Sequence, residues 1–310
     1  MAINLFYFLV FPGLLFVSVT GGLLSWADRK ITARVQFRKG PPVLQPFYDF
    51  FKLLLVKETI LPKRGSSALF LLAPLFSVAG ATVAGTLIML PLFNITNGFK
   101  GDLLVVFYLL TIPSFSYIMG ALASGNPLAA VGGSREMKLI LSYELTFMLV
   151  IAGIIMKCSQ HFDLRSVIDA QQAGSPFIGS VSGVLLFVAG LFCVQAKLAL
   201  VPFDMPEAEA EITEGIFIEY SGAAYALIKL TKYIMLFILP SFLVLLFMGG
   251  FRLEGIHILW AVLKVLLVLL LITLVRNTNP RIRIKQAIRF FLLWMNLIAV
   301  IAIVLIAFGY

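Results

Sequence analysis

The chain has 310 residues, of which 61% are hydrophobic and only 13% are charged, and its formal net charge is +9. An average soluble domain is about 45–50% apolar and about 25% charged. A soluble globule is excluded because one domain cannot hide this much apolar surface from water, and disorder is excluded for the same reason. The basic residues are dispersed between long apolar runs, which argues against nucleic-acid binding. The composition therefore indicates a polytopic helical protein of the lipid bilayer.

Eight apolar stretches are long enough to cross a hydrocarbon core, which needs about 20 helical residues. They lie at 3–26, 68–92, 103–123, 138–156, 179–200, 222–248, 256–275 and 289–309. Unbroken apolar runs such as Leu266–Leu271 do not alternate as barrel strands do. No low-complexity linker or internal repeat divides the chain. Residues 1–310 are therefore predicted to form a single all-α domain with eight transmembrane helices.

Lys and Arg concentrate in the odd-numbered loops between these spans, above all in loop 27–67 and after residue 275. Basic loops face the cytoplasm in multi-pass proteins. Loops 27–67 and 201–221 are therefore predicted to be cytoplasmic, which leaves both termini outside.

The first of these loops contains an amphipathic segment, PPVLQPFYDFFKLLLVKETI, from Pro41 to Ile60. Its apolar residues recur at helical spacing, opposite Asp49, Lys52 and Lys57, and the segment is too short to span. We expect a helix along the cytoplasmic interface, which serves either as a membrane-surface helix or as a docking platform for a cytoplasmic partner. The candidate docking residues are Arg34, Arg38, Lys39, Gln45, Asp49 and Lys52. Positive-inside topology alone also explains the basic ones.

Six of the 15 acidic residues fall in one short loop: Asp204, Glu207, Glu209, Glu211, Glu214 and Glu219. Apolar residues interrupt this run, which favours a buried or half-buried carboxylate chain over a solvated acidic loop. Like charges held together in a low dielectric cannot all ionise, so the pKa of some carboxyls rises and they can exchange protons. On a helix starting near Pro206, Glu207, Glu211 and Glu214 would share one face.

Three more charges lie at membrane depth. Glu144 sits inside the fourth span, where a carboxylate is either functional or bonded to a neighbouring helix. Lys229 lies early in the sixth span, where it either snorkels or pairs with the carboxylates. Lys264 lies near the middle of the seventh. With the six loop acids these residues form a predicted proton relay, whereas the two cysteines lack metal-ligand spacing and no metal or catalytic residue is predicted.

Two long motifs of this sequence resemble the motifs of a known family. VPFDMPEAEAEITEGIFIEYSG (Val201–Gly222) and ARVQFRKGPPVLQPFYDFFKLLLVKE (Ala33–Glu58) are similar to the signature loops of the membrane heel subunit of respiratory complex I. LSYE (Leu141–Glu144) resembles a further motif of that family. Together with the eight spans, the resemblance covers essentially the whole chain.

Within that superfamily, three features differ from the quinone-reducing type: the Gly40-Pro41-Pro42 turn, Leu200, and the segment Ala130–Met137. They resemble the membrane anchor of energy-converting [NiFe] hydrogenases, formate hydrogenlyase and membrane-bound sulfane reductase modules. The resemblance implies a non-catalytic subunit in a prokaryotic cell membrane that couples ferredoxin- or formate-linked electron flow to proton or sodium translocation. It also implies the partners: an iron–sulfur small subunit, a [NiFe]-type large subunit and antiporter-like membrane subunits. The iron–sulfur clusters and any [NiFe] site would belong to those partners.

Three other functions stay open. A quinone-binding heel subunit of an NADH dehydrogenase-like complex would share the same motifs. A stand-alone cation carrier would transport ions without partners, and the absence of a repeat argues against it. A passive anchor would use its acids only to hold a basic partner.

Overall fold

The computed structural model describes residues 2–63, 65–95, 102–158, 161–251 and 255–309, and the side chains of 2, 209 and 210 lie outside this description. Within these ranges the chain is almost entirely helical. The helices of the bundle are α1 (Ala2–Leu9), α2 (Leu14–Val35), α4 (Ser67–Leu92), α5 (Leu103–Leu109), α6 (Ile112–Ala123), α7 (Pro127–Lys157), α8 (Leu164–Ala173), α9 (Val181–Lys197), α11 (Gly222–Phe247), α12 (His257–Thr278), α13 (Ile284–Arg289), its π-helical continuation η5 (Phe290–Met295) and α14 (Asn296–Ala307).

Seven of the described helices are long and apolar enough to cross a membrane, when α1 with α2, α5 with α6, and α13 with α14 are each counted as one. The eighth predicted span is α9, which is shorter but packs within the bundle against α7, α11 and α14. The all-α, multi-pass prediction is therefore confirmed. Helix α7 begins at Pro127, before the predicted start of that span, because the segment with Gly132 and Gly133 stays helical.

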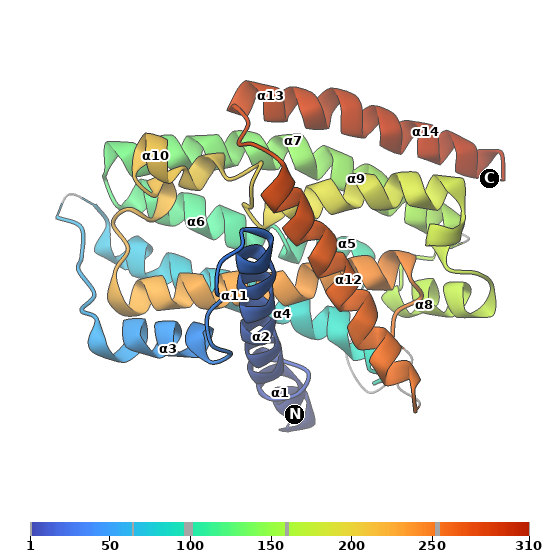
Figure 1. Cartoon of the computed structure of the whole chain (residues 1–310), viewed down its shortest axis with the longest axis horizontal. Coiled ribbons are helices and arrows are strands. Elements are labelled where there is room, and N and C mark those ends of the chain that lie inside the picture. Colours follow the sequence, from blue (N-terminus) through green and yellow to red (C-terminus); the bar gives the residue numbers. More distant parts are fainter. Residues whose placement is uncertain (1, 64, 96–101, 159–160, 252–254, 310) are drawn as a thin grey trace.

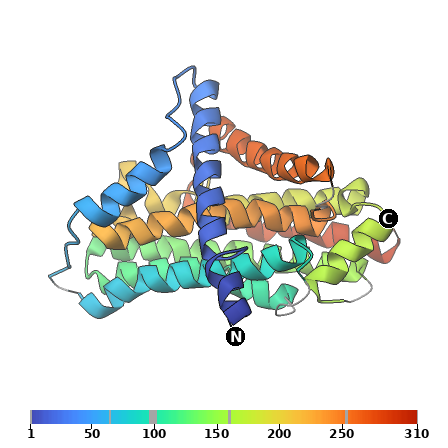
Figure 2. The same ribbon diagram turned by 90° about the horizontal axis from the view of Figure 1, so that it is seen from below.

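Helix α11 forms the centre of the bundle, because it packs against α2, α4, α9 and α12 and nearly all of its later half is buried. Most helices run roughly along the long axis of the molecule, whereas α2 crosses them steeply and α12 lies obliquely (Figures 1 and 2). The crossing of α2 over α11 is close because Gly21 lies against the backbone of Tyr233. A side chain at this position would not fit.

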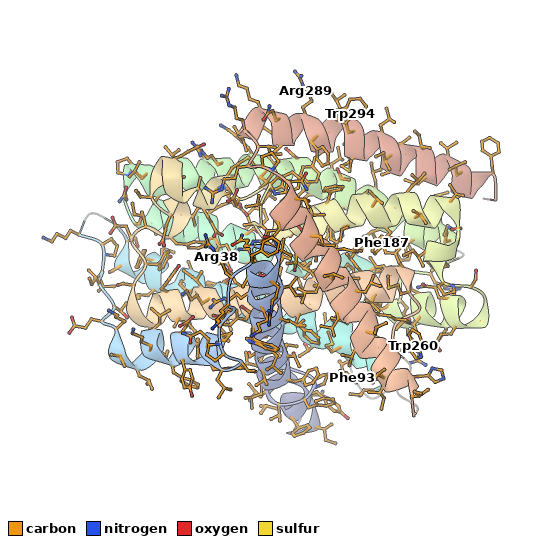
Figure 3. The ribbon with its side chains drawn as sticks, in the orientation of Figure 1. Arg38, Phe93, Phe187, Trp260, Arg289 and Trp294 are labelled. Atoms are coloured by element: carbon orange, nitrogen blue, oxygen red, sulfur yellow. The ribbon has the colours of Figure 1, made fainter. Side chains whose placement is uncertain are left out.

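The outer faces of α12 and α14 remain apolar and exposed. Trp260 and Trp294 are more than half exposed, and Trp294 points away from the bundle (Figure 3). Such faces suit a lipid environment. Arg289 also points outward, one turn before Trp294 on the same side of the molecule (Figure 3).

The connecting residues 57–63, 65–66, 124–126, 198–221 and 279–283 lie toward the left of Figure 1, and 93–95, 161–180, 248–251 and 255–256 lie toward its right. We call the first side the basic end of the bundle. Contacts tie its loops together: the Ser66 amide donates to the Ala123 carbonyl, and the Asn126 amide donates to Glu219 at 2.6 Å.

The predicted interfacial helix is present in a shorter form, as α3 (Gln45–Phe51) followed by a π turn, η1 (Lys52–Val56). It packs against α2 and α11. The predicted apolar face is divided between two surroundings, because Phe47 packs toward Gly22 whereas Phe51 and Leu55 are 52% and 77% exposed.

Candidate functional site

A cavity of about 350 Å³ opens inside the basic end, between α2, α6, α7, α9, α11, α12 and the segment 198–217. Its lining is unusual for the interior of an apolar bundle, because it contains ten charged side chains. They are Asp28, Arg29, Glu136, Lys197, Asp204, Glu207, Lys229, Lys232, Arg276 and Arg281. Charges in such surroundings are costly unless they are paired or functional.

Three ion pairs join helices and loops around this cavity. Asp28 of α2 is 2.7 Å from the Arg276 guanidinium of α12 and also accepts a hydrogen bond from Thr273 at 2.9 Å. Glu207 is 2.6 Å from the Lys232 ammonium of α11. Each pair connects segments far apart in sequence, so the charges hold the cavity wall in place.

Asp204 forms the third pair, with Arg281 at 2.8 Å, in the connection between α9 and α11. Its side chain is only 11% exposed. Burial raises the pKa of the Asp204 carboxyl above its usual value, and the neighbouring Arg281 charge opposes that shift only in part. Its Oδ1 atom is buried without a hydrogen-bond partner among the described residues. Asp204 is therefore a carboxyl suited to exchange a proton with water in the cavity.

Glu144 lies deeper in the bundle, on α7, and pairs with Lys197 of α9 at 2.5 Å. The Lys197 side chain is 1% exposed and the Glu144 side chain is 16% exposed. Two alternatives were left open for Glu144, a functional carboxylate or a bond to a neighbouring helix. The structure shows such a bond, to a charged partner, and the proton-relay role of Glu144 stays a prediction. A second buried acid of α7, Glu136, is 4% exposed and lines the cavity.

The acidic segment does not form the expected helix. It consists of three short turns, η3 (Met205–Glu207), α10 (Glu209–Ile212) and η4 (Gly215–Phe217), because Thr213, Glu214 and Gly215 adopt left-handed backbone conformations. The prediction that Glu207, Glu211 and Glu214 share one helical face is therefore wrong.

Burial within this segment is also uneven. Asp204 is buried, and Glu207 and Glu219 are half-buried, as predicted. Glu211 pairs with Arg135 at 2.7 Å but its side chain is 64% exposed, and Glu214 is exposed. Their surroundings correspond to the alternative of a solvated acidic surface. The side chain of Glu209 lies outside the described residues.

The two predicted relay lysines lie in different places. The Lys229 ammonium lies over the Tyr225 ring, 5.1 Å from its centroid, and lines the cavity. Lys264 donates hydrogen bonds to the carbonyls of Met248 and Gly250, at 2.6 and 3.1 Å. The structure therefore brings Lys229 to the site and leaves Lys264 at the opposite end of the bundle.

The predicted docking residues divide into two groups. Asp49 and Gln45 are engaged within the chain, since Asp49 accepts from Arg29 at 3.0 Å and from Gln45 at 2.9 Å. Burial alone raises the pKa of Asp49, but the hydrogen bonds from Arg29 and Gln45 outweigh it and lower the pKa below its usual value. The other candidates are exposed: Arg34, Arg38, Lys39 and Lys52.

Sequence reasoning did not name seven charged residues of the site as functional candidates: Asp28, Arg29, Glu136, Lys197, Lys232, Arg276 and Arg281. The basic ones were explained by topology alone, and their partners lie up to 248 residues away. One signal in the sequence could have pointed to Glu136: it lies eight residues before Glu144, which is about two turns of one helix.

The multi-pass helical fold agrees with the known proteins to which the chain is similar. A family model described as NADH dehydrogenase matches residues 7–307. The chain therefore belongs to the NADH dehydrogenase subunit 1 family of membrane proteins.

Particular relatives support this assignment. The chain is 35% identical over 282 residues to a subunit of the NADH-quinone oxidoreductase of Syntrophotalea carbinolica, covering 85% of this chain and 83% of that protein. It is 32% identical over 308 residues to the corresponding NADH-quinone oxidoreductase subunit of Paramagnetospirillum magneticum, covering 93% and 88%. A chain of the membrane-bound sulfane sulfur reductase, an archaeal respiratory membrane complex, has the same fold with a TM-score of 0.89, 28% identity, and coverage of 98% of this chain and 99% of that one.

Proposed function

We propose that the chain is the membrane anchor and coupling subunit of an ion-translocating oxidoreductase related to complex I. In this proposal the basic end faces the cytoplasm of a prokaryotic cell, both termini lie outside, and a redox arm with iron–sulfur clusters docks on the basic end. Electron flow in that arm, from ferredoxin or formate, drives proton or sodium movement through antiporter-like neighbours. The likeness to subunits of respiratory complexes supports this assignment.

The observation that carries the proposal is the charged cavity. Four carboxylates and six cations line it, and three of the carboxylates are paired with cations from other segments of the chain. One buried oxygen of Asp204 makes no hydrogen bond within the described residues. Movement of a proton onto one such carboxyl breaks or weakens its pair, and so changes the charges that face the bundle interior. A reaction at the basic end can in this way be linked to ion movement in the membrane.

Exposed residues around the basic end supply the docking surface in this proposal. Arg34 lies in the last turn of α2, Arg38 and Lys39 follow that helix, and all three are exposed. Tyr48 and Phe51 of α3 are 61% and 52% exposed. Basic side chains next to exposed aromatic rings are suited to a protein partner with acidic and apolar groups.

The experiment is to purify the chain with its native partners, reconstitute the complex in liposomes and compare it with the Asp204→Asn variant. We expect the variant to keep electron transfer to an artificial acceptor and to lose most ion translocation. An unchanged number of ions per electron would defeat the coupling role, and recovery of the chain without any redox partner would defeat the anchor role.

A second candidate function is quinone binding, because the two bacterial relatives are subunits of NADH-quinone oxidoreductases. The same cavity would then hold a quinone headgroup, and Tyr117, Tyr225 and Tyr233 lie in its wall. Reduction of an added short-chain quinone by the purified complex, with loss in a Tyr225→Phe variant, would favour this function. Electron delivery only to protons or polysulfide would exclude it.

A further inference from the structure

The Lys197 ammonium occupies an aromatic cage within the bundle. Its Nζ atom lies 5.8, 5.1 and 5.4 Å from the ring centroids of Phe107, Tyr143 and Phe147. A cation is attracted to the faces of such rings, most strongly where water is excluded. The only carboxylate that the described residues bring within salt-bridge distance of this ammonium is Glu144.

Lys197 also reaches the cavity. It lines the cavity wall together with Glu136, whose side chain comes from the same helix as Glu144. The Oε2 atom of Glu136 is buried and makes no hydrogen bond within the described part of the chain, and the same holds for Oε2 of Glu144. Two acids of α7, one in the cavity and one deeper, therefore flank a single long side chain on α9.

We propose that Lys197 is a tethered cation that exchanges with the translocated ion at Glu144. This inference deepens the proposed coupling function and rests on it for its role in transport. When a proton from cavity water binds Glu144, an O–H bond forms, the carboxylate loses its charge and the ammonium is no longer held. The ammonium, still protonated, then turns toward Glu136 in the cavity. Loss of the proton toward the interior of the membrane restores the original pair.

Simple electrostatics explains why this exchange works in both directions. A buried carboxylate without a counter-charge is strongly disfavoured, so Glu144 is stable either as an ion pair or as a protonated, neutral group. The aromatic cage stabilises the ammonium after it has left Glu144 and before it reaches Glu136, because ring faces attract a cation without carrying a full negative charge. Lys197 thus lets Glu144 change its protonation without leaving either charge isolated in the bundle.

The test is infrared spectroscopy on the purified complex with its partners at neutral pH, in which a protonated carboxyl gives a distinct carbonyl stretching band. The Lys197→Met variant is expected to gain such a band, equivalent to one group per complex, because Glu144 must take up a proton once its partner is gone. The Lys197→Met/Glu144→Gln double variant is expected to lack the band. Lys197→Arg, which keeps the charge, and Lys138→Met, which removes an exposed lysine of α7, are matched controls that gain none.

Absence of the band in Lys197→Met, or its persistence in the double variant, would overturn the proposal. If Lys197→Met does not assemble, the double variant decides, because removing both charges leaves no isolated carboxylate and assembly should return. If the complex does not assemble with the double variant either, Lys197 acts through something other than Glu144, and the proposal is overturned.

Ion translocation is measured on the same variants, with the complex reconstituted in liposomes. We expect Lys197→Met to retain electron transfer and to lose at least about tenfold in ions moved per electron, and Lys197→Arg to retain translocation. Unchanged translocation in Lys197→Met would contradict the exchange. If the unmodified complex moves no ions, the proposed function fails, but the infrared result still decides whether Lys197 sets the charge of Glu144.

Discussion

Replacement of Asp28 shows how much the cavity wall depends on charges that join distant helices. Asp28 lies on α2, and its side chain is 8% exposed. It accepts from Arg276 and Thr273, both on α12, at 2.7 and 2.9 Å. Because α2 crosses the bundle steeply, this contact is one of its main polar attachments to α12.

The expected loss of stability follows from how deeply Asp28 and Arg276 are buried. Removal of one member of a buried ion pair costs about 3–5 kcal/mol, because the remaining charge is left in a low dielectric. The Arg276 side chain is 34% exposed, so water recovers part of that cost. We expect about 2–3 kcal/mol for Asp28→Leu. Asp28→Asn keeps one carbonyl oxygen, which can accept from Arg276, but it loses the charge and the second acceptor that faces Thr273. The Thr273 hydroxyl can still donate to the Leu269 carbonyl, so this change corresponds to about 1 kcal/mol.

The assay is reversible unfolding of the chain in mixed detergent micelles, titrated with a denaturing detergent, for Asp28→Asn, Asp28→Leu, Arg276→Leu and the double leucine variant. The double variant should be at least about 1 kcal/mol more stable than the sum of the single losses predicts, because it isolates no charge. Additive losses, or equal losses for Asp28→Asn and Asp28→Leu, would refute the reasoning.

Three further predictions concern the surroundings of the site. Gly21→Ala places a Cβ 2.1 Å from a backbone oxygen of α11, so it should destabilise the chain by about 1–3 kcal/mol, whereas Gly179→Ala, with nothing within 4 Å, should change stability by less than about 0.5 kcal/mol in the same assay. The lowered pKa of Asp49 means that its pair with Arg29 contributes fully above the usual carboxyl pKa near 3.9 and is lost as the pH falls through the lower native pKa. Hydrogen exchange of α3 should therefore accelerate in that acid range, and Asp49→Asn should remove the pH dependence. Glu211→Gln should leave ion translocation unchanged because this side chain is 64% exposed, and a large loss of translocation would show that the buried cavity is not the coupling site.

The spans could be predicted from the sequence because they depend on one local property, the length of an apolar run. The helix α9 was predicted at 179–200 and is observed at Val181–Lys197, 17 residues long, because the chain leaves the helix after Lys197. The extension of α7 to Pro127 was not predicted, since glycines such as Gly132 usually weaken a helix. Here the Gly132 backbone packs against Gly215 and Pro206, and only a residue without a side chain fits there.

The acidic segment shows where sequence spacing was insufficient. Its carboxylates suggested a continuous helix, but Thr213 and Glu214 take left-handed conformations that no local pattern signalled. Tertiary contacts determine that path, because Ile216 and Phe217 are buried against neighbouring helices. Asp204 at one end of the segment is therefore buried and Glu219 at the other end is half-buried, while Glu211 and Glu214 in the middle reach solvent.

Pairing across the bundle was the least predictable feature. Lys197 stands at the end of a span, where a lysine usually marks the membrane boundary. Its actual surroundings, a carboxylate and three aromatic rings, come from α5 and α7, and nothing within α9 itself identifies them. The sequence supplied Glu144 as a candidate, and only the fold supplied its partner.

The most direct test of the account is the number of ions translocated per electron by the reconstituted complex carrying Glu144→Gln. Glutamine preserves the size of the side chain but cannot take up or release a proton. We predict that electron transfer to an artificial acceptor continues in this variant while ion translocation is abolished. A variant that translocates ions at the unmodified ratio would contradict it.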